Sequence, residues 1–144
     1  MGRVYEEITP EIRHWIGEHA SGVRFLNLFC YTATATVHAA LGGATHSTSV
    51  DMSRTYLNWA ARNFEINGMD KRQHTLVQQD CMKFLEDCDE QFDLIFLDPP
   101  TFSNSKNTEN VLDIQRDHVD LIHDCLDLLT PEGVLVFSTN HRKF

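Results

Sequence analysis

Apolar and polar residues follow one another along the chain in blocks that predict a regular succession of strands and helices. The pattern predicts five strands, at residues 23–28, 46–50, 75–79, 92–97 and 134–138. The first, fourth and fifth of them are largely apolar, whereas the second and third contain more polar residues. Apolar side chains at helical spacing predict five helices, at residues 9–20, 34–41, 53–68, 82–88 and 111–129. Strands that alternate with helices pair in parallel through right-handed crossovers. The pattern therefore predicts a Rossmann-like α/β fold, with a parallel sheet and helices on both faces.

Capping and turn residues set the boundaries of these elements. Ser53 is a favourable N-cap for the third helix, and Pro131-Glu132-Gly133 predicts a turn into the fifth strand. The chain stops six residues after that strand, which would be an unprotected edge unless another element covers it. We therefore expect residues 1–144 to form a single domain, truncated after the fifth strand, that is a fragment of a larger protein.

The loop that follows the first strand is the first candidate for ligand binding. In parallel α/β sheets, ligands bind beyond the carboxyl ends of the strands, near the point where the strand order reverses. The loop NLFCYTATA, which starts at Asn27, contains no glycine, whereas a dinucleotide pyrophosphate needs a G-x-G-x-x-G loop. This argues against a nicotinamide dehydrogenase and favours a cofactor without phosphates, such as S-adenosylmethionine. An ordinary turn between strand and helix is the alternative interpretation.

Two acids follow the second and third predicted strands. Asp51 ends the second strand, where a carboxylate can accept hydrogen bonds from both ribose hydroxyls of an adenosine. Asp80 ends the third strand, where it can accept the adenine amino group while the backbone N–H of Cys81 meets the ring. Taken singly, such an acid is more often a helix N-cap.

The segment Asp98-Pro99-Pro100-Thr101-Phe102 is the sharpest signal in the sequence. It follows the strand FDLIFL, which is apolar except for one aspartate, so its polar groups project into the cleft at the carboxyl end of the sheet. The two prolines stiffen the loop and leave carbonyl groups facing outward, and Phe102 offers a ring on which a base can stack. A simple turn at the end of a strand is the less favoured interpretation.

Polar and basic residues near this segment are candidates for contacts with a polyanion. Ser103 and Lys106 continue the same loop, and Lys106 is suited to an RNA phosphate. Arg142 belongs to a cluster of cationic groups after the fifth strand, whose carboxyl end faces the same cleft. A solvated loop and a solvated tail are equally good interpretations of these two segments.

Net charge limits how this chain binds nucleic acid. The sequence has 12 basic and 21 acidic residues, a formal charge of −9, whereas nucleic-acid binding usually depends on a basic face. Either the substrate is not a polyanion, or the basic surface that captures it lies on parts of the enzyme outside this chain.

Cysteine, histidine and apolar content exclude other classes of protein. The four cysteines form no C-x-x-C pair and the eight histidines no H-E-x-x-H spacing, so we expect no metal site and reduced cysteines. No apolar run approaches the roughly 20 residues that span a bilayer, and no signal peptide is evident. The sequence predicts a cytoplasmic protein without a membrane partner.

Five strings stand out when the loops are considered together: FCYT at 29–32, VDMSRTY at 50–56, QDC at 79–81, DPPTFSNSK at 98–106 and IQRDH at 114–118. Together they resemble the RlmK family, the C-terminal half of the bifunctional RlmKL (RlmL) methyltransferases of large-subunit ribosomal RNA. The resemblance runs from about residue 25 to residue 144, and the string DPPTFSNSK is its most specific part. The resemblance implies a Rossmann-like methyltransferase that uses S-adenosylmethionine and methylates N7 of a guanine in ribosomal RNA.

The resemblance also implies a role for each candidate residue. The methionine side of the cofactor would be lined by Asn27, Phe29, Tyr31, Thr32 and Ala33. Asp51 and Met52 would hold the ribose side, and Asp80 and Cys81 the adenine. Asp98, Pro99, Pro100 and Phe102 would form the catalytic loop, with Asp98 also near the cofactor. The RNA would be contacted by Phe102, Ser103, Lys106 and Arg142.

Guanine N7 carries no proton, so methyl transfer to it requires alignment more than a general base. Asp98 is then expected to organise the cleft and the methionine amino group through its charge. Ala33 stands where the family usually has a glycine or a similarly permissive turn, so we expect weaker cofactor binding.

Two other functions compete with this interpretation. RNA cytosine-C5 methyltransferases of related fold use a cysteine nucleophile, but the fifth strand here ends in STN, without cysteine. A non-catalytic fragment that binds a cofactor or a protein is compatible with the acid excess.

Overall fold

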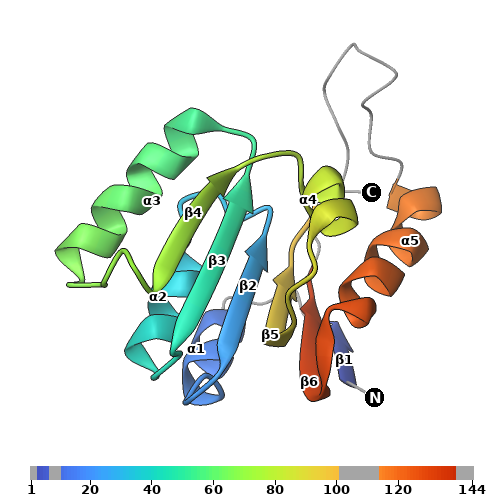
Figure 1. Ribbon diagram of the computed structural model, residues 1–144, viewed down its shortest axis with the longest axis horizontal. Helices are drawn as coiled ribbons and strands as arrows, with labels where there is room; N and C mark the ends of the chain where they lie inside the picture. Colours follow the sequence, from blue (N-terminus) through green and yellow to red (C-terminus); the bar gives the residue numbers. More distant parts are fainter. Residues whose placement is uncertain (1–2, 7–10, 101–113, 139–144) are drawn as a thin grey trace.

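The computed structural model describes residues 3–6, 11–100 and 114–138. Across that part of the chain, six parallel strands form one sheet in the order β1-β6-β5-β2-β3-β4 (Figure 1). The strands are β1 (Arg3–Glu6), β2 (Arg24–Leu28), β3 (His46–Asp51), β4 (His74–Gln78), β5 (Phe92–Leu97) and β6 (Leu129–Phe137). The helices are α1 (Glu11–Glu18), α2 (Thr34–Leu41), α3 (Arg54–Ile66), α4 (Cys81–Asp87) and α5 (Ile114–Asp127). The Rossmann-like α/β fold is confirmed.

Every predicted strand and helix forms, with shifts of a few residues at the ends. Ser53 caps α3 as expected, since its Oγ accepts a hydrogen bond from the Tyr56 N–H at 3.1 Å. The turn predicted at residues 131–133 is wrong, because β6 continues through it. The register between β5 and β6 shifts there instead, which accommodates the extra residues of β6. Positions 9, 10 and 111–113, also predicted as helical, lie outside the described residues.

The first strand was not predicted, and it changes the edge of the sheet. β1 pairs in parallel with β6, with Arg3 opposite Val134 and Glu6 opposite Phe137. The five predicted strands form, and β1 is a sixth strand that covers the edge of β6, which would otherwise have been unprotected. Four residues, RVYE, are too few to show a period in the sequence.

Side chains of the central strands alternate between two faces of the sheet. Leu26 and Leu28 of β2 pack into the core beneath α4 and α5, whereas Phe25 packs beneath α1 and α2. The same alternation in β5 sends Ile95 to the first core and Leu94 to the second. Apolar runs such as FDLIFL are thus buried on both faces, as expected for central parallel strands.

Helices α1 and α2 meet at a contact between glycines. A Cβ added to Gly42 would lie 2.0 Å from the carbonyl oxygen of Gly17, so no larger residue fits. Gly43 follows with φ of +106° and ends α2, a conformation that glycine adopts without strain. The predicted stop at these two glycines therefore combines a packing requirement with a backbone requirement.

The position of β2 determines where a ligand can bind. β2 is bonded to β3 on one side and to β5 on the other, so the strand order reverses there (Figure 1). The loops at the carboxyl ends of β2, β3, β4 and β5 accordingly form the candidate site. Among the helices described here, none has both the length and the apolar character that crossing a bilayer requires.

Candidate functional site

The loop after β2 has an unusual backbone. Phe29, Tyr31 and Ala33 have φ of 59°, 53° and 61°, in the left-handed region that favours glycine. The loop is held by hydrogen bonds from the Cys30 N–H to the Val50 carbonyl at 3.0 Å and from the Ala33 N–H to the Cys30 carbonyl at 2.7 Å. A loop without glycine therefore adopts a tight path for which glycines are normally used. Ala33 itself has the left-handed conformation that a glycine would adopt at this position.

Asp51 joins the loops that follow β2 and β3. Its Oδ2 accepts a hydrogen bond from the Tyr31 N–H at 3.0 Å, and its Oδ1 accepts one from the Ser53 N–H at 2.9 Å. Ser53, not Asp51, is the N-cap of α3, so the capping alternative for Asp51 does not hold. Each carboxylate oxygen retains a lone pair after these contacts and can accept a ribose hydroxyl.

Asp80 and Cys81 both serve structural roles at the start of α4. Asp80 is exposed, and its Oδ1 caps the helix by accepting the Met82 N–H at 3.1 Å, which confirms the capping interpretation. The Cys81 thiol is buried, accepts the Phe29 N–H at 3.1 Å and donates to the Val50 carbonyl at 3.6 Å. Burial raises the pKa of this thiol to about 12. The remaining Asp80 oxygen and the first-turn N–H of Cys81 are the groups left for an adenine.

Asn27 lies beneath the first turn of α2. Its Nδ2 donates to Thr36 Oγ1 at 2.9 Å, and Thr36 is in turn hydrogen-bonded to Ser49 Oγ at 2.6 Å. Asn27 is only 1% exposed, and its Oδ1 has no hydrogen-bond partner within the described residues. Sequence reasoning missed Thr36 and Ser49, which no residue pattern distinguished from ordinary strand and helix positions.

The amino end of α2 lacks a side-chain cap. Ala33 is the N-cap residue and makes no side-chain hydrogen bond to the helix, so the first-turn N–H groups have no acceptor from it. A carboxylate at such a helix end is stabilised by these N–H groups and by the helix dipole. The uncapped turn and the orphaned amide oxygen of Asn27 together fit the carboxylate and ammonium groups of a methionine.

Asp98 follows β5 in a partly buried position. Burial raises the pKa of its carboxyl group to about 6, against the opposing effects of a hydrogen bond with Ser138 and the charge of Arg13. Ser138 was not predicted as a site residue, although its position at the end of the last strand marks it. Pro99 is buried and Pro100 half-buried.

Tyr31 connects these strand ends electrostatically. Burial raises the pKa of its phenol, and the charges of Asp98 and Asp51 raise it further. The phenol therefore lies within electrostatic range of both carboxylates, one after β5 and the other after β3. The structure brings these residues together at one edge of the sheet, and Met52 lies at the same edge with 65% exposure. Thr32 contributes a carbonyl that accepts the Asn63 Nδ2 at 3.0 Å.

Four predicted residues remain without a structural test. Phe102, Ser103, Lys106 and Arg142 lie outside the described residues, so their contacts with RNA remain predictions. No group of three or more metal-ligating side chains is found in the part of the chain that the structure describes.

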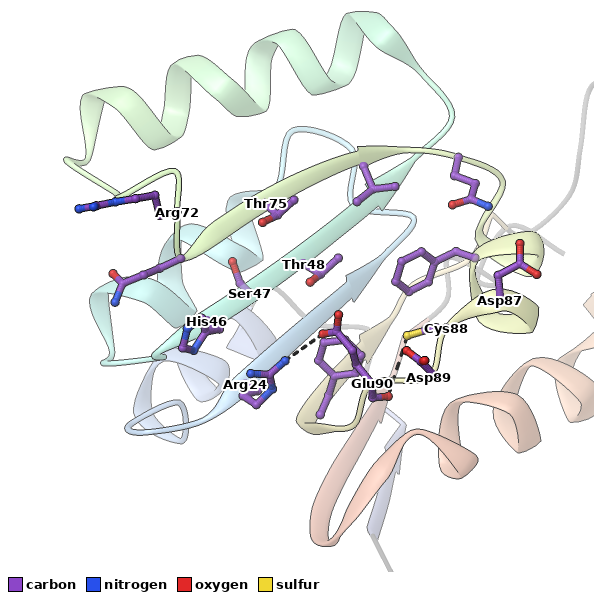
Figure 2. A pocket seen from close by; sticks show the side chains of 15 residues that line it. Arg24, His46, Ser47, Thr48, Arg72, Thr75, Asp87, Cys88, Asp89 and Glu90 are labelled. Carbon is purple, nitrogen blue, oxygen red and sulfur yellow. Dashed lines mark hydrogen bonds and ion pairs between the residues drawn. The ribbon is translucent and has the colours of Figure 1, made fainter.

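A separate groove of about 430 Å³ runs along the face of the sheet on the side of α4. Figure 2 shows Thr48 and Thr75 on its floor and the ion pair between Arg24 and Glu90, 2.9 Å long, at its rim. None of the predicted site residues lines this groove. It lies along the strands instead of beyond their carboxyl ends, so it is not the candidate cofactor site.

Comparison with known proteins shows the family to which the chain belongs. A family model of S-adenosylmethionine-dependent methyltransferases matches residues 9–143, and so begins earlier in the chain than the predicted resemblance. The ribosomal RNA large subunit methyltransferase K/L of Cellvibrio japonicus is 60% identical over 133 residues, 92% of this chain and 18% of that protein. The protein of the same name from Saccharophagus degradans is 61% identical over 133 residues, with the same two shares.

Solved structures share the fold and the cofactor class. The crystal structure of SMU.776, a methyltransferase complexed with SAH, matches with a TM-score of 0.83 and 33% identity, over 90% of this chain and 34% of that one. The methyltransferase of Agrobacterium tumefaciens, described as SAM-dependent, matches with a TM-score of 0.78 and 27% identity, over 90% of this chain and 44% of that one.

The chain spans less than a fifth of the length of the ribosomal RNA methyltransferases that it matches, at 18% of each. The family model, in contrast, covers nearly all of this chain. The predicted cofactor, S-adenosylmethionine, is confirmed as that of the family. By the match of this model and by its sheet order and strand-end loops, the chain belongs to the family of S-adenosylmethionine-dependent methyltransferases.

Proposed function

We propose that this chain is the cofactor-binding core of an enzyme that methylates N7 of a guanine in large-subunit ribosomal RNA. The observation that carries the proposal is the position of Asp51, whose two carboxylate oxygens accept the Tyr31 N–H of the loop after β2 and the Ser53 N–H after β3. The charge of Asp98, after β5, raises the pKa of the Tyr31 phenol, which agrees with a third strand end beside this loop. Relatives about 60% identical that are named ribosomal RNA large subunit methyltransferase K/L support the choice of substrate.

The chain's own residues provide a position for each part of S-adenosylmethionine. Asp51 holds the ribose hydroxyls, with Met52 alongside, and Asp80 with the Cys81 N–H takes the adenine. The first turn of α2 takes the methionine carboxylate, in the loop formed by Phe29 to Ala33 above Asn27. When bound, the cofactor supplies an electrophilic methyl group on a sulfonium.

The acceptor atom requires positioning more than proton transfer. Guanine N7 has an in-plane lone pair and no proton, so no strong base is needed. Asp98 holds the methionine ammonium group and orders the cleft through its charge. Pro99 and Pro100 keep the following loop stiff, so that Phe102 stacks on the guanine, and Ser103, Lys106 and Arg142 bind neighbouring RNA groups.

The cysteines of the chain weigh against transfer to cytosine C5. That reaction needs a thiolate near the cofactor. Burial raises the pKa of the thiols of Cys30, Cys81 and Cys125, the second to about 12, so all three are neutral thiols at physiological pH. Cys88 lies on the separate groove, away from the strand-end loops.

Two measurements test the proposal. Calorimetry with S-adenosylmethionine is expected to show binding to the 144-residue chain, whereas NAD should not bind. Mass mapping of ribosomal RNA from cells that lack the full-length gene is expected to show the loss of one N7-methylguanine. An unchanged N7-methylguanine content would refute the substrate, and cofactor binding without any methyl transfer by the full-length protein would favour the non-catalytic alternative.

A further inference from the structure

Two aromatic side chains are exposed on α3 beside the candidate cofactor site. α3 begins directly after the loop that carries Asp51, at the carboxyl end of β3 (Figure 1). Tyr56 on its first turn is 42% exposed, and Trp59 on its second turn is 58% exposed. The face of α3 that packs on the sheet is formed by other residues, Leu57, Ala60 and Phe64. Tyr56 and Trp59, which we name the α3 aromatic pair, are therefore not needed for the core.

One member of the α3 aromatic pair, Tyr56, is connected to the carboxylate that we assign to the ribose. The ring of Tyr56 meets the ring of Tyr31 edge to face, with centroids 5.4 Å apart and planes at 67°. The Tyr56 N–H donates to Ser53 Oγ at 3.1 Å, and the Ser53 N–H donates to Asp51. The Tyr31 N–H donates to Asp51 as well. The Asp51 carboxylate thus connects the loop that carries Tyr31 with the start of α3, which carries Tyr56. The contact between these two rings is therefore formed before a ligand binds.

The surroundings of the α3 aromatic pair are polar and include a cation. Thr55, Asn58 and Arg62 are exposed on the same helix, and Arg62 lies one turn beyond Trp59. Arg62 forms no ion pair with the residues that the structure describes, where only three such pairs occur. A guanidinium beside an open ring face suits a phosphate next to a stacked base.

The chemistry of these groups favours RNA over a protein partner. A stable protein interface buries roughly 800 Å² on each side around an apolar centre, whereas the large apolar side chains exposed here are the two rings, Tyr31, Met52 and, two turns along α3 from Trp59, Ile66. Ring faces bind any unpaired base with little sequence preference. The chain carries a charge of −9, which repels the phosphates of RNA. Stacking of a base on uncharged rings is the kind of contact that this repulsion weakens least.

We propose that the α3 aromatic pair stacks an unpaired base of the RNA substrate, next to the base that enters the cofactor site. The proposal rests on the proposed function and extends it, since it adds an RNA contact among the described residues to the candidates that lie outside them. Tyr31 acts as a positioning residue, because its ring supports that of Tyr56.

The test is the affinity of the 144-residue chain for a fluorescently labelled single-stranded oligoribonucleotide, followed by anisotropy. Trp59→Ala and Tyr56→Ala are each expected to raise the Kd about tenfold, the loss typical of one stacked base. Trp59→Phe should retain most of the affinity because it keeps a ring. Leu41→Ala, which removes a more exposed apolar side chain at the far end of α2, is the control and should leave the Kd unchanged. Circular dichroism checks that each variant is folded.

A second readout uses the two tryptophans of the chain. In a Trp15→Phe background, Trp59 is the only tryptophan, and the single-stranded oligonucleotide is expected to quench the tryptophan emission more than a duplex of the same sequence does. Unchanged Kd values in folded Trp59→Ala and Tyr56→Ala variants would overturn the proposal. So would a concentration-dependent dimer that these variants abolish, since that result would identify a protein interface. Calorimetry with S-adenosylmethionine on the same samples separates failure of this proposal from failure of the cofactor site.

Discussion

The three left-handed residues of the loop after β2 concentrate strain at the candidate site. A non-glycine residue in this region typically costs of order 1 kcal/mol or more. Phe29, Tyr31 and Ala33 each carry this cost, within a stretch of five positions. Their backbone N–H groups offset it by donating hydrogen bonds to Cys81 Sγ, to Asp51 and to the Cys30 carbonyl, respectively. The loop is therefore kept in place by its partners on β3 and α4 and not by glycine.

Replacing Asp51 tests this arrangement. Asp51→Asn places an NH₂ group against one of two backbone N–H donors, so we expect a loss of about 1–3 kcal/mol in the free energy of unfolding. The affinity for S-adenosylmethionine should fall at least tenfold, because a ribose acceptor is lost. Chemical denaturation and calorimetry measure the two effects. Asp87→Asn, an exposed change on α4, is the matched control, and a variant with full stability and full affinity would contradict the assignment.

Asp98 predicts a pH dependence of stability. Its pKa in the folded chain is about 6, above the ordinary carboxyl value of 3.8, because the neutral form is favoured by burial. Its contribution to stability is therefore complete below about pH 4 and is lost as the pH rises through about 6. Relative to Asp98→Asn, the wild-type chain should lose about 2–3 kcal/mol of unfolding free energy between pH 4 and pH 7. Denaturation of both chains at each pH measures this difference.

Cofactor binding should show the opposite dependence on pH. If Asp98 holds the methionine ammonium group, only its ionised form binds, so the affinity for S-adenosylmethionine should fall as the pH drops below about 6. Asp98→Asn should bind weakly and show no such slope. A wild-type affinity that is constant between pH 5 and pH 7 would remove Asp98 from the cofactor site.

At the scale of residues, strand ends were easier to predict than orientations. Asp51 and Asp98 directly follow predicted strands, so their positions at the edge of the sheet were evident. Asn27 lies inside an apolar run that is buried on both faces, where the sequence does not reveal which face a side chain meets. The structure places it beneath α2, and its contact with the cofactor remains a prediction. The left-handed loop was also hidden, since the usual signal for it is glycine.

At the scale of elements, the packing of α1 on α2 depends on the absence of side chains. The Cβ of an alanine at position 42 would overlap the Gly17 carbonyl at 2.0 Å, so the two helices would have to separate. We expect Gly42→Ala to cost roughly 2–4 kcal/mol, beyond the usual range for a surface change. Gly22→Ala is the control: the added Cβ meets nothing within 4 Å, and only its φ of +76° opposes it, for a cost of about 1 kcal/mol. Equal effects of the two changes would contradict the packing argument.

Helices were predicted more accurately than the connection into the last strand. The period of apolar residues and the Ser53 cap located α3 to within two residues of its ends. In β6, proline and glycine at 131–133 favoured a turn, but the strand accommodates them through a register shift against β5. Such irregular pairing depends on the neighbouring strand, which local sequence does not specify.

At the scale of the whole molecule, β1 protects the edge of β6. A chain that begins after Glu6 should expose the unpaired backbone of β6, which promotes association between sheets. We expect this variant to lose roughly 2–4 kcal/mol of stability through the missing backbone hydrogen bonds. It should also elute as a concentration-dependent oligomer in size-exclusion chromatography. A chain that lacks only residues 1 and 2 retains β1 and is the control; monomeric behaviour of both would contradict the role of β1.

The overall architecture followed from the alternation of strands and helices, whereas the position of β1 did not. Parallel crossovers connect neighbours in sequence, so the order of the five later strands conforms to a general rule. β1 joins the sheet beside the last strand. No local sequence pattern predicts a pairing between strands so far apart in the sequence.

The partnership of β1 and β6 has a consequence for how the chain reaches its native state. A ribosome synthesises Arg3 long before Val134, the residue opposite which it finally lies. The β1 segment must therefore wait, not yet paired with β6, until residues 129–137 have been translated. Closing so long a loop is slow, so attachment of β1 should be a late step in folding. In a refolding experiment, the backbone amide of Val4 should therefore become protected from hydrogen exchange later than the backbone amide of Leu26.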